Sequence, residues 1–327
     1  MNTKMKIAVI GAGSWGTTLA VILGEKGYDT RLWARREELA KEINDKKENK
    51  EYLPQVKIPN RVIATSSFKD AIENTDIIFI SVPSAYLRDT LKKIKPYYKS
   101  QIVVSTTKGF EASGKRMSQI IEEELSTQKV AVLSGPNHAE EVSMKMPTAS
   151  IVACKNLKTG KIICDVLQTD YFKLYELNDV AGVEICAALK NIAALATGAC
   201  DGLGFGDNSK AAIITLSLIE MNNFGRHFGA KRGTVYGLAG VGDLVATCMS
   251  RHSRNRKVGE QLAKGKSMEE IKKEMKGMVA EGITATKSVY EYSKKHKIEM
   301  PLTQQAYEVI FQNKSMKNAL KDLLRLI

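Results

Sequence analysis

Cysteine and histidine are scarce in this 327-residue sequence, with five and four copies. None of them stands at a spacing typical of a metal site. Cys186 and Cys200 lie inside apolar helical stretches, where a free thiol behaves as a small hydrophobe. The pattern predicts reduced cysteines and no metal ion, as is typical of a cytoplasmic protein.

The sequence also lacks blocks of like charge, long hydrophobic runs, internal repeats and low-complexity segments. Its net charge of +13 is spread along the chain, so we expect it to attract small anionic ligands and not nucleic acid. The first 24 residues imitate a signal peptide, but three glycines within six positions interrupt the apolar part. No apolar run is judged to reach membrane-spanning length. We therefore expect neither export nor stable membrane insertion.

Short β-branched runs alternate with amphipathic helical patterns over the first half of the chain. The expected strands are 6–10, 30–34, 76–82, 101–106, 129–134, 148–154 and 171–177, and the helices between them are 14–26, 36–47, 85–94, 115–125 and 137–144. Buried strands that alternate with helices are typical of a parallel sheet covered on both faces. After residue 178 only helical patterns follow, at 179–199, 208–229, 256–263, 267–275, 283–296, 302–311 and 316–325. The predicted fold is α/β, with a Rossmann-type doubly wound sheet domain at 1–178 followed by an all-helical domain at 179–327.

The stretch "VIGAGSWG" sets Gly11, Gly13 and Gly16 between the first strand and the first helix. In this order and context the first glycine permits a tight turn, the second lets the backbone approach a pyrophosphate, and the third lets helix and strand pack closely. Free N–H groups at the helix start would bind the phosphates. The motif predicts a dinucleotide cofactor.

Two further stretches follow strand ends. "GFEASGKR" after Lys108 is nearly a phosphate-binding NTPase loop, but Arg116 replaces the hydroxyl residue that would hold Mg²⁺, so this is the lesser hypothesis. In a second interpretation the Lys108 side chain lies in the ligand-binding crevice of the sheet. In a third interpretation Lys108 is a solvated loop lysine. In "SGPNHAEEV" we expect Asn137 to cap a helix, with His138 structural or exposed.

Lys190 lies in the apolar helical stretch "EICAALKNIAALATGAC". Its neighbours three and four positions away carry no carboxylate, and an unpaired buried ammonium costs several kcal/mol. Its partner must therefore come from elsewhere in the fold or from a ligand. Asp243, an acid among Gly, Val and Leu, and four basic residues at 251, 254, 256 and 257 follow in one later segment. Arginine and a helix N-terminus suit a phosphate, so we interpret this segment and Lys190 as one site.

A set of blocks in fixed order resembles the bacterial NAD(P)-dependent glycerol-3-phosphate dehydrogenase family over residues 5–310. The blocks are "GAGSWGTTLA", "TTKG", "GPNHAEEV", "ALKNIAALATGACDGLGFGDNSKAAI", "GLAGVGDLVATC", "SRNRKVG" and "VAEGITATKSV". The resemblance implies reversible reduction of dihydroxyacetone phosphate to sn-glycerol 3-phosphate, which supplies glycerophospholipid synthesis.

The resemblance also implies site residues. It gives Lys190 as the catalytic lysine with Asp243 beside it. Around the substrate it gives Lys108, Gly135, Asn137, Lys190, Asp243, Ser253, Arg254 and Asn255. Around the cofactor it gives Gly11, Gly13, Ser14, Trp15, Gly16, Arg35, Arg36, Lys108, Ala139, Arg254, Val279 and Glu281. The sequence departs from the family at Asn137, where serine is common, and at Leu216-Ser217, where Arg-Gly is usual.

The second predicted strand runs into Arg35 and Arg36, where NAD-specific folds carry an acid for the ribose 2′-OH. Arginines at a helix start oppose its dipole, so we expect an anion there, the 2′-phosphate of NADP. The predicted cofactors are NADP, preferred, and NAD. Solvated arginines are the alternative interpretation.

Two other functions stay open. One is a dinucleotide-binding sensor without chemistry, and the other is a two-domain dehydrogenase for a β-hydroxy acid, whose carboxylate the arginines could equally bind. As partners we expect a phosphorylated small-molecule substrate and a second copy of the chain in a homodimer, although the residues themselves define no oligomeric state.

Overall fold

The computed structural model describes residues 5–274 and 281–325, which fold into two compact units. The first unit contains the chain up to Thr107 together with Met117–Val180, and the second contains Lys108–Arg116 together with the chain from Ala181 onward. The nine residues 108–116 are therefore part of the helical unit, although they precede the predicted domain limit at residue 178 by about seventy positions in the chain.

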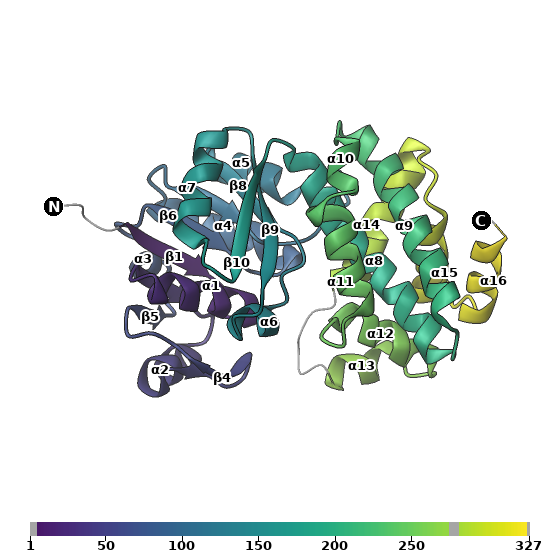
Figure 1. The fold of residues 1–327 in the computed structure, drawn as a ribbon, viewed down its shortest axis with the longest axis horizontal. Coiled ribbons are helices and arrows are strands. Elements are labelled where there is room, and N and C mark those ends of the chain that lie inside the picture. The colour runs from purple at the N-terminus through teal and green to yellow at the C-terminus, as the bar shows by residue number, and fades with distance from the viewer. Residues whose placement is uncertain (1–4, 275–280, 326–327) are drawn as a thin grey trace. The chain divides into compact units, whose positions relative to one another are not determined.

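The first unit is built on an eight-stranded sheet in the order β10-β9-β8-β7-β6-β1-β2-β5 (Figure 1). The strands are β1 Lys6–Ile10, β2 Asp29–Trp33, β5 Val62–Thr65, β6 Ile77–Ile80, β7 Ile102–Ser105, β8 Val130–Ser134, β9 Thr148–Cys154 and β10 Phe172–Leu177, and a separate hairpin contains β3 Glu48–Asn49 and β4 Leu53–Lys57. From β5 to β8 the strands run parallel in the 3-2-1-4-5-6 order of dinucleotide-binding folds. The α/β prediction is confirmed. The edge strand β5 was not predicted.

The last two strands depart from the predicted parallel arrangement, because β9 runs antiparallel to β8 and β10 is parallel to β9. A parallel connection needs a long crossover, usually a helix that spans the sheet. Between β8 and β9 the only helix is α6 Ala139–Ser143, which has five residues, so the chain returns alongside β8 in the opposite direction.

Helices cover both faces of this sheet. They are α1 Ser14–Glu25, α2 Glu37–Lys46, α3 Phe68–Ile72, α4 Leu87–Ile94, α5 Met117–Leu125, α6 and α7 Leu157–Leu167, with 3₁₀ turns at Ser84–Tyr86 and Lys95–Tyr97. Side chains of β1 alternate between the two faces: Ile7 and Val9 join the core beneath α1 and α7, whereas Ala8 and Ile10 join the core beneath α3, α4 and α5. This double burial explains why the strand is apolar throughout. Helices α3 and α7 were missed by the sequence analysis.

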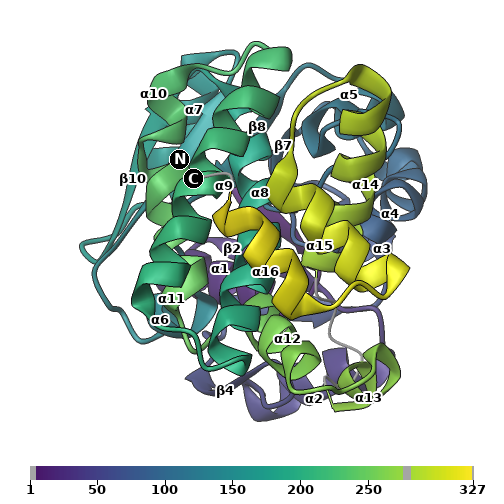
Figure 2. The same cartoon turned by 90° about the vertical axis from the view of Figure 1, so that its right-hand side faces the viewer.

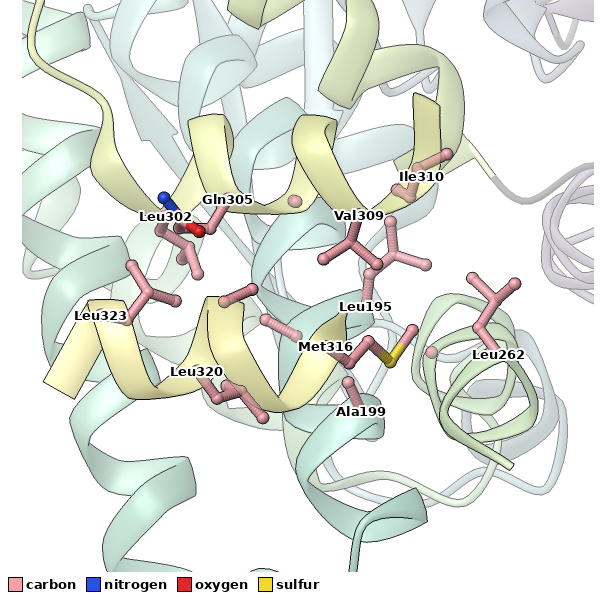
Figure 3. A pocket seen from close by; sticks show the side chains of 14 residues that line it. Leu195, Ala199, Leu262, Leu302, Gln305, Val309, Ile310, Met316, Leu320 and Leu323 are labelled. Atoms are coloured by element: carbon pink, nitrogen blue, oxygen red, sulfur yellow. The ribbon is translucent and has the colours of Figure 1, made fainter. Parts of the chain in front are cut away.

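The second unit is helical, as predicted (Figure 2). Its elements are α8 Val180–Gly202, α9 Asp207–His227, α10 Arg232–Val235, a π-helical turn Leu238–Gly242, α11 Asp243–Met249, α12 Arg254–Ala263, α13 Met268–Glu274, α14 Glu281–His296, α15 Pro301–Gln312 and α16 Met316–Leu324. The backbones of α8 and α12 are in contact at Gly198. A Cβ there would lie only 1.9 Å from the carbonyl oxygen of Arg256, so only glycine fits. A small apolar cavity of about 50 Å³ lies among α8, α12, α15 and α16, with Gln305 at its wall (Figure 3).

Helix α8 is long and apolar enough to cross a membrane, which corrects the expectation that no stretch reaches that length. In the fold, 83% of its most apolar window is buried, as in the core helix of a folded unit. All five cysteines are free and buried.

Candidate active site

The glycine loop of the first unit has the geometry that its sequence predicts. Gly11 has a φ of +117°, and a Cβ there would lie 2.6 Å from the carbonyl oxygen of Ser81, just past β6. Gly16 packs on the backbone of Gly11, because a Cβ on Gly16 would lie 1.8 Å from the Gly11 carbonyl oxygen and cannot be accommodated. A Cβ on Gly13, in contrast, would meet no atom within 4 Å. The second glycine therefore leaves open space beside the start of α1, where no side chain caps the backbone N–H groups.

A buried asparagine supports this loop. Asn49 donates from its amide to the carbonyl oxygen of Ala12 at 2.9 Å and to the hydroxyl of Thr17 at 2.8 Å. Ser14, predicted beside the cofactor, donates its own hydroxyl to the Tyr52 carbonyl oxygen at 2.7 Å. Asn49 was missed by the sequence analysis, because it stands among charged residues that resemble an exposed loop.

The two arginines after β2 are exposed but differ in their partners. Arg36 precedes the first residue of α2 and pairs with Glu51, a hydrogen bond that raises the pKa of its guanidinium. Arg35 forms no ion pair with any described residue. Because Glu51 already offsets the charge of Arg36, the helix-dipole argument for a bound anion applies to Arg35 alone.

Gly135, Asn137 and Ala139 follow β8 at the same edge of the sheet. Gly135 has a φ of +146° and packs against Ser150, whose hydroxyl also accepts from the Asn137 amide at 3.0 Å. The prediction that Asn137 caps a helix is wrong, because His138 occupies the N-cap position of α6. Ala139 begins α6, and Trp15 is half-buried and edge-on to Phe172.

Lys190 of the second unit points at Asp243, as the absence of a helical partner had predicted. Its ammonium donates to one carboxylate oxygen of Asp243 and to the hydroxyl of Thr247 at 2.8 Å. That hydroxyl donates in turn to the Asp243 main-chain carbonyl oxygen at 2.6 Å. Thr247 was not predicted, although it stands one helical turn after Asp243 on α11 and so on the same face.

The entry of the chain into α11 places the Asp243 carboxylate inside the unit. Gly240, in the π-helical turn, packs so closely on Val235 that a Cβ would lie 1.9 Å from the Val235 carbonyl oxygen. Asp243 follows as the first residue of α11 and is 2% exposed. Gly242, and not Asp243, occupies the N-cap position of α11.

Lys108 contacts the same carboxylate from the opposite side. Its ammonium lies 2.9 Å from the second oxygen of Asp243, and its side chain is 18% exposed. It therefore belongs to the lysine–aspartate centre of the helical unit. The residues alone had suggested the crevice of the sheet, whereas the family resemblance had given Lys108 around the substrate with Lys190 and Asp243. The stretch after it makes internal backbone hydrogen bonds, Glu111 N–H to Lys115 and Gly114 N–H to Glu111, which a phosphate-binding loop would keep free.

The charges of this centre shift the pKa values of its members. Burial lowers the pKa of Lys190 to about 8, with Lys108 acting in the same direction and Asp243 against it. Burial disfavours the charge of Asp243, yet the ammonium groups of Lys108 and Lys190 outweigh it and hold its pKa below the usual value. Two cations share one carboxylate, so the centre carries an excess positive charge near neutral pH.

The basic segment at 251–257 divides into structural and exposed residues. Ser253 is the N-cap of α12 and accepts from the Arg256 N–H at 3.3 Å. Arg256 pairs with Asp201 at the end of α8. Asn255 is buried and bridges helices, donating to the Asn191 side chain at 3.0 Å and accepting from the Gly282 N–H at 2.9 Å.

Arg254, the first residue of α12, is exposed and makes no hydrogen bond or ion pair with the described part of the chain. Arg251 is likewise exposed and has no such partner in the described part of the chain, but it precedes the N-cap, whereas Arg254 lies at the helix start with its donors free. Through Asn191, the neighbour of Lys190, Asn255 fixes the start of α12 on α8. Asn191 was visible in the sequence as the polar residue next to Lys190 in an apolar helix. Glu281 begins α14, and Val279 lies outside the described residues.

Comparisons with known proteins agree across both units. Residues 6–160 match the family model described as NAD-dependent glycerol-3-phosphate dehydrogenase N-terminus, and residues 179–321 match the corresponding C-terminus. A glycerol-3-phosphate dehydrogenase [NAD(P)+] of Chlorobium phaeobacteroides (strain BS1) is 47% identical over 98% of this chain and 97% of its own length. One from Bacillus pumilus (strain SAFR-032) is 44% identical, over 98% and 94%. The crystal structure of glycerol-3-phosphate dehydrogenase from Coxiella burnetii superimposes with a TM-score of 0.94 and 37% identity, over 98% of this chain and 99% of that one.

Proposed function

Because this chain belongs to the NAD-dependent glycerol-3-phosphate dehydrogenase family, it is an oxidoreductase that interconverts dihydroxyacetone phosphate and glycerol 3-phosphate, and we propose that Lys190 and Asp243 form its catalytic centre. The observation that carries the proposal is the ammonium of Lys190, buried on a carboxylate that it shares with Lys108. This centre has a proton to give and a positive charge in excess.

Reduction of a ketone builds negative charge on the carbonyl oxygen. A positioned ammonium stabilises that charge and delivers the proton, and burial brings its pKa toward working pH. In this proposal Lys190 is the general acid. Asp243 and Thr247 hold its ammonium in one direction, and Lys108 supplies a second charge at the carboxylate.

The cofactor is NADP or NAD, and when bound its nicotinamide supplies the hydride. The glycine loop fits such a group, because the space beside Gly13 is open and the first N–H groups of α1 have no side-chain cap. The residues proposed to hold it are Gly11, Gly13, Ser14, Trp15, Gly16, Arg35, Arg36, Lys108, Ala139, Arg254, Val279 and Glu281.

For the substrate phosphate we propose Arg254, whose guanidinium is exposed at the start of α12. Gly135, Asn137, Ser253 and Asn255 complete the proposed substrate set, and the last three have side-chain hydrogen bonds within the protein. Their part is therefore to shape the site. We also propose the limits 1–178 and 179–327 for the cofactor and substrate domains, apart from residues 108–116, which belong to the helical unit. A cytoplasmic location, a homodimer and a supply of product to glycerophospholipid synthesis are part of the same proposal.

A substrate comparison tests the function directly. NADPH oxidation, followed at 340 nm, is expected with dihydroxyacetone phosphate and not with dihydroxyacetone or a β-keto acid. Turnover of the β-keto acid alone would assign the arginine to a carboxylate and reject the proposed substrate.

The pKa of Lys190 predicts opposite pH dependence for the two directions. The acid form is needed for reduction, so kcat/KM should fall as the pH rises through about 8. The neutral base is needed for oxidation of glycerol 3-phosphate, so that rate should rise through the same pH. Initial rates between pH 6 and 10 check this, and two limbs of the same sign would contradict the role of Lys190.

Arg254→Ala is expected to raise KM for dihydroxyacetone phosphate and to change kcat little, because a phosphate is bound alike in the ground and transition states. Lys257→Ala is the matched control, an exposed basic residue on the same helix. An unchanged KM in the Arg254 variant, or an equal rise in the control, would remove Arg254 from the phosphate site.

Arg35 is expected to favour NADPH over NADH. Arg35→Asp should cost NADPH use about 1.5–3 kcal/mol in kcat/KM, the usual worth of hydrogen bonds to a charged group, and leave NADH use nearly unchanged. Lys41→Asp makes the same charge change at an exposed position of α2 and should affect neither cofactor. Equal wild-type efficiencies with the two cofactors would contradict a selective Arg35.

A further inference from the structure

Residues 108–116 form a closed hairpin within the helical unit. Phe110 and Arg116 face each other in an antiparallel bridge, and the Glu111 N–H donates to the Lys115 carbonyl oxygen at 3.0 Å. Lys108 stands two residues before the bridge. The position of the bridge therefore determines where the Lys108 backbone lies.

An aromatic cage holds one side of the hairpin. The Phe110 ring is 3% exposed and lies edge-on to three rings, with centroid distances of 5.2 Å to Phe224, 5.5 Å to Phe228 and 5.4 Å to Tyr292. Gly114 packs on the same Tyr292 ring, which a Cβ would approach to 2.3 Å. Edge-on aromatic pairs contribute stabilisation beyond that of the apolar area they bury, so these contacts hold the hairpin firmly on the helical unit.

A buried ion pair holds the other side. The Arg116 guanidinium lies 2.6 Å from the carboxylate of Glu184, whose side chain is 2% exposed. Glu184 is on α8, the helix that carries Lys190. The hairpin is thus fixed to the same helix whose lysine shares a carboxylate with Lys108.

We propose that Phe110 and Arg116 are positioning residues for Lys108, holding its ammonium on the second oxygen of Asp243. The inference rests on the proposed catalytic centre. A lysine carries a point charge on a flexible four-carbon stem. Because the Lys108 side chain is 18% exposed, burial alone would not hold its ammonium on one oxygen of Asp243. The docked hairpin supplies that order, and with it a fixed second charge beside Lys190.

The protonation of Lys190 reports whether the Lys108 ammonium is held on Asp243. The charged groups around it are Asp243 and Lys108, and the neighbouring thiol of Cys248 stays neutral because burial raises its pKa to about 12. If the hairpin loosens, a positive charge leaves the shared carboxylate, and Lys190 holds its proton more strongly. The fall of kcat/KM for reduction at alkaline pH, which we call the alkaline limb, then moves to higher pH.

The test compares pH profiles of kcat/KM for reduction in Phe110→Ala, Lys108→Met and the double variant. Lys108→Met should move the alkaline limb upward by about one pH unit, the order expected of a nearby charge, and Phe110→Ala should move it partway. In the double variant Phe110→Ala should add no further shift. Leu320→Ala, a core truncation elsewhere in the same unit, should lower the melting temperature and leave the limb in place.

Phe110→Leu keeps an apolar anchor and decides the question if the alanine variant does not fold; it should give a smaller shift in the same direction. Arg116→Met combined with Glu184→Gln, which removes both charges of this ion pair, should shift the limb likewise. A lower kcat with an unmoved limb in the folded variants, or a further shift on the Lys108→Met background, would overturn the inference. Failure of the proposed function itself is distinct, because the wild-type protein would then show no alkaline limb with dihydroxyacetone phosphate.

Discussion

Lys190→Ala is expected to lower kcat for dihydroxyacetone phosphate reduction by about 10²–10⁴, the usual contribution of a positioned general acid. The variant loses the group that delivers the proton and one of the two charges beside the developing alkoxide. Initial rates under saturating NADPH and substrate measure the effect.

The variant should remain folded, for a reason visible in the centre. Asp243 keeps its ion pair with Lys108, so removal of Lys190 leaves no carboxylate without a counter-charge. Unchanged thermal unfolding and cofactor binding are therefore the controls. Lys190→Arg keeps a positive charge but holds its proton too firmly to exchange it, so it too should stay well below the wild-type rate. A near wild-type kcat in a folded Lys190→Ala protein would reject the catalytic assignment.

Features of the fold that a local rule determines can be predicted from the sequence. Three glycines between a strand and a helix determine a turn whose space can be stated atom by atom, and Gly11, Gly13 and Gly16 have the geometry expected of them. A lysine without a helical partner must find one elsewhere, and Lys190 finds Asp243, 53 positions away in the chain. Both features follow from the high free-energy cost of a steric clash or of an unpaired buried charge.

Features that depend on which distant segment packs nearby cannot be predicted in this way. No local pattern assigns residues 108–116 to the helical unit, because that assignment follows from the aromatic rings around Phe110 and from Glu184, which are far away in the chain. The strand Val62–Thr65 has four residues and too little periodicity to stand out. The family resemblance gives Ser253 and Asn255 around the substrate, but only the fold shows that Asn255 also bridges helices, because its partners Asn191 and Gly282 are distant in the chain.

Asp243→Asn is expected to reduce both stability and activity, and the two losses should separate. The substitution leaves two ammonium groups beside a neutral amide, one of them on the buried Lys190. Removal of one partner from a buried pair typically costs 3–5 kcal/mol, and we expect about 3 kcal/mol because Lys190 can release its proton. Chemical denaturation measures the loss, and kcat should fall together with it.

The pH dependence of this stability loss identifies its cause. Burial already lowers the pKa of Lys190 to about 8, and without Asp243 the pKa falls further. The folded variant then releases the proton at lower pH than the folded wild type, while the unfolded chains bind it equally. By linkage, the stability deficit shrinks as the pH rises from neutral toward about 8. A deficit that is constant across this range would point to lost packing instead of an unpaired charge.

Asp243→Asn combined with Lys190→Met removes both members of the pair. The double variant leaves no charge at either buried position, so it should recover most of the loss of about 3 kcal/mol expected for Asp243→Asn alone. Its activity should not recover, because no proton donor remains. If the double variant regained turnover, the pair would be a structural element of the helical unit, and the proton would have to come from another group. If the single variant were as stable as the wild type, Lys190 would not depend on Asp243 for its charge, and the centre described here would lose its electrostatic basis.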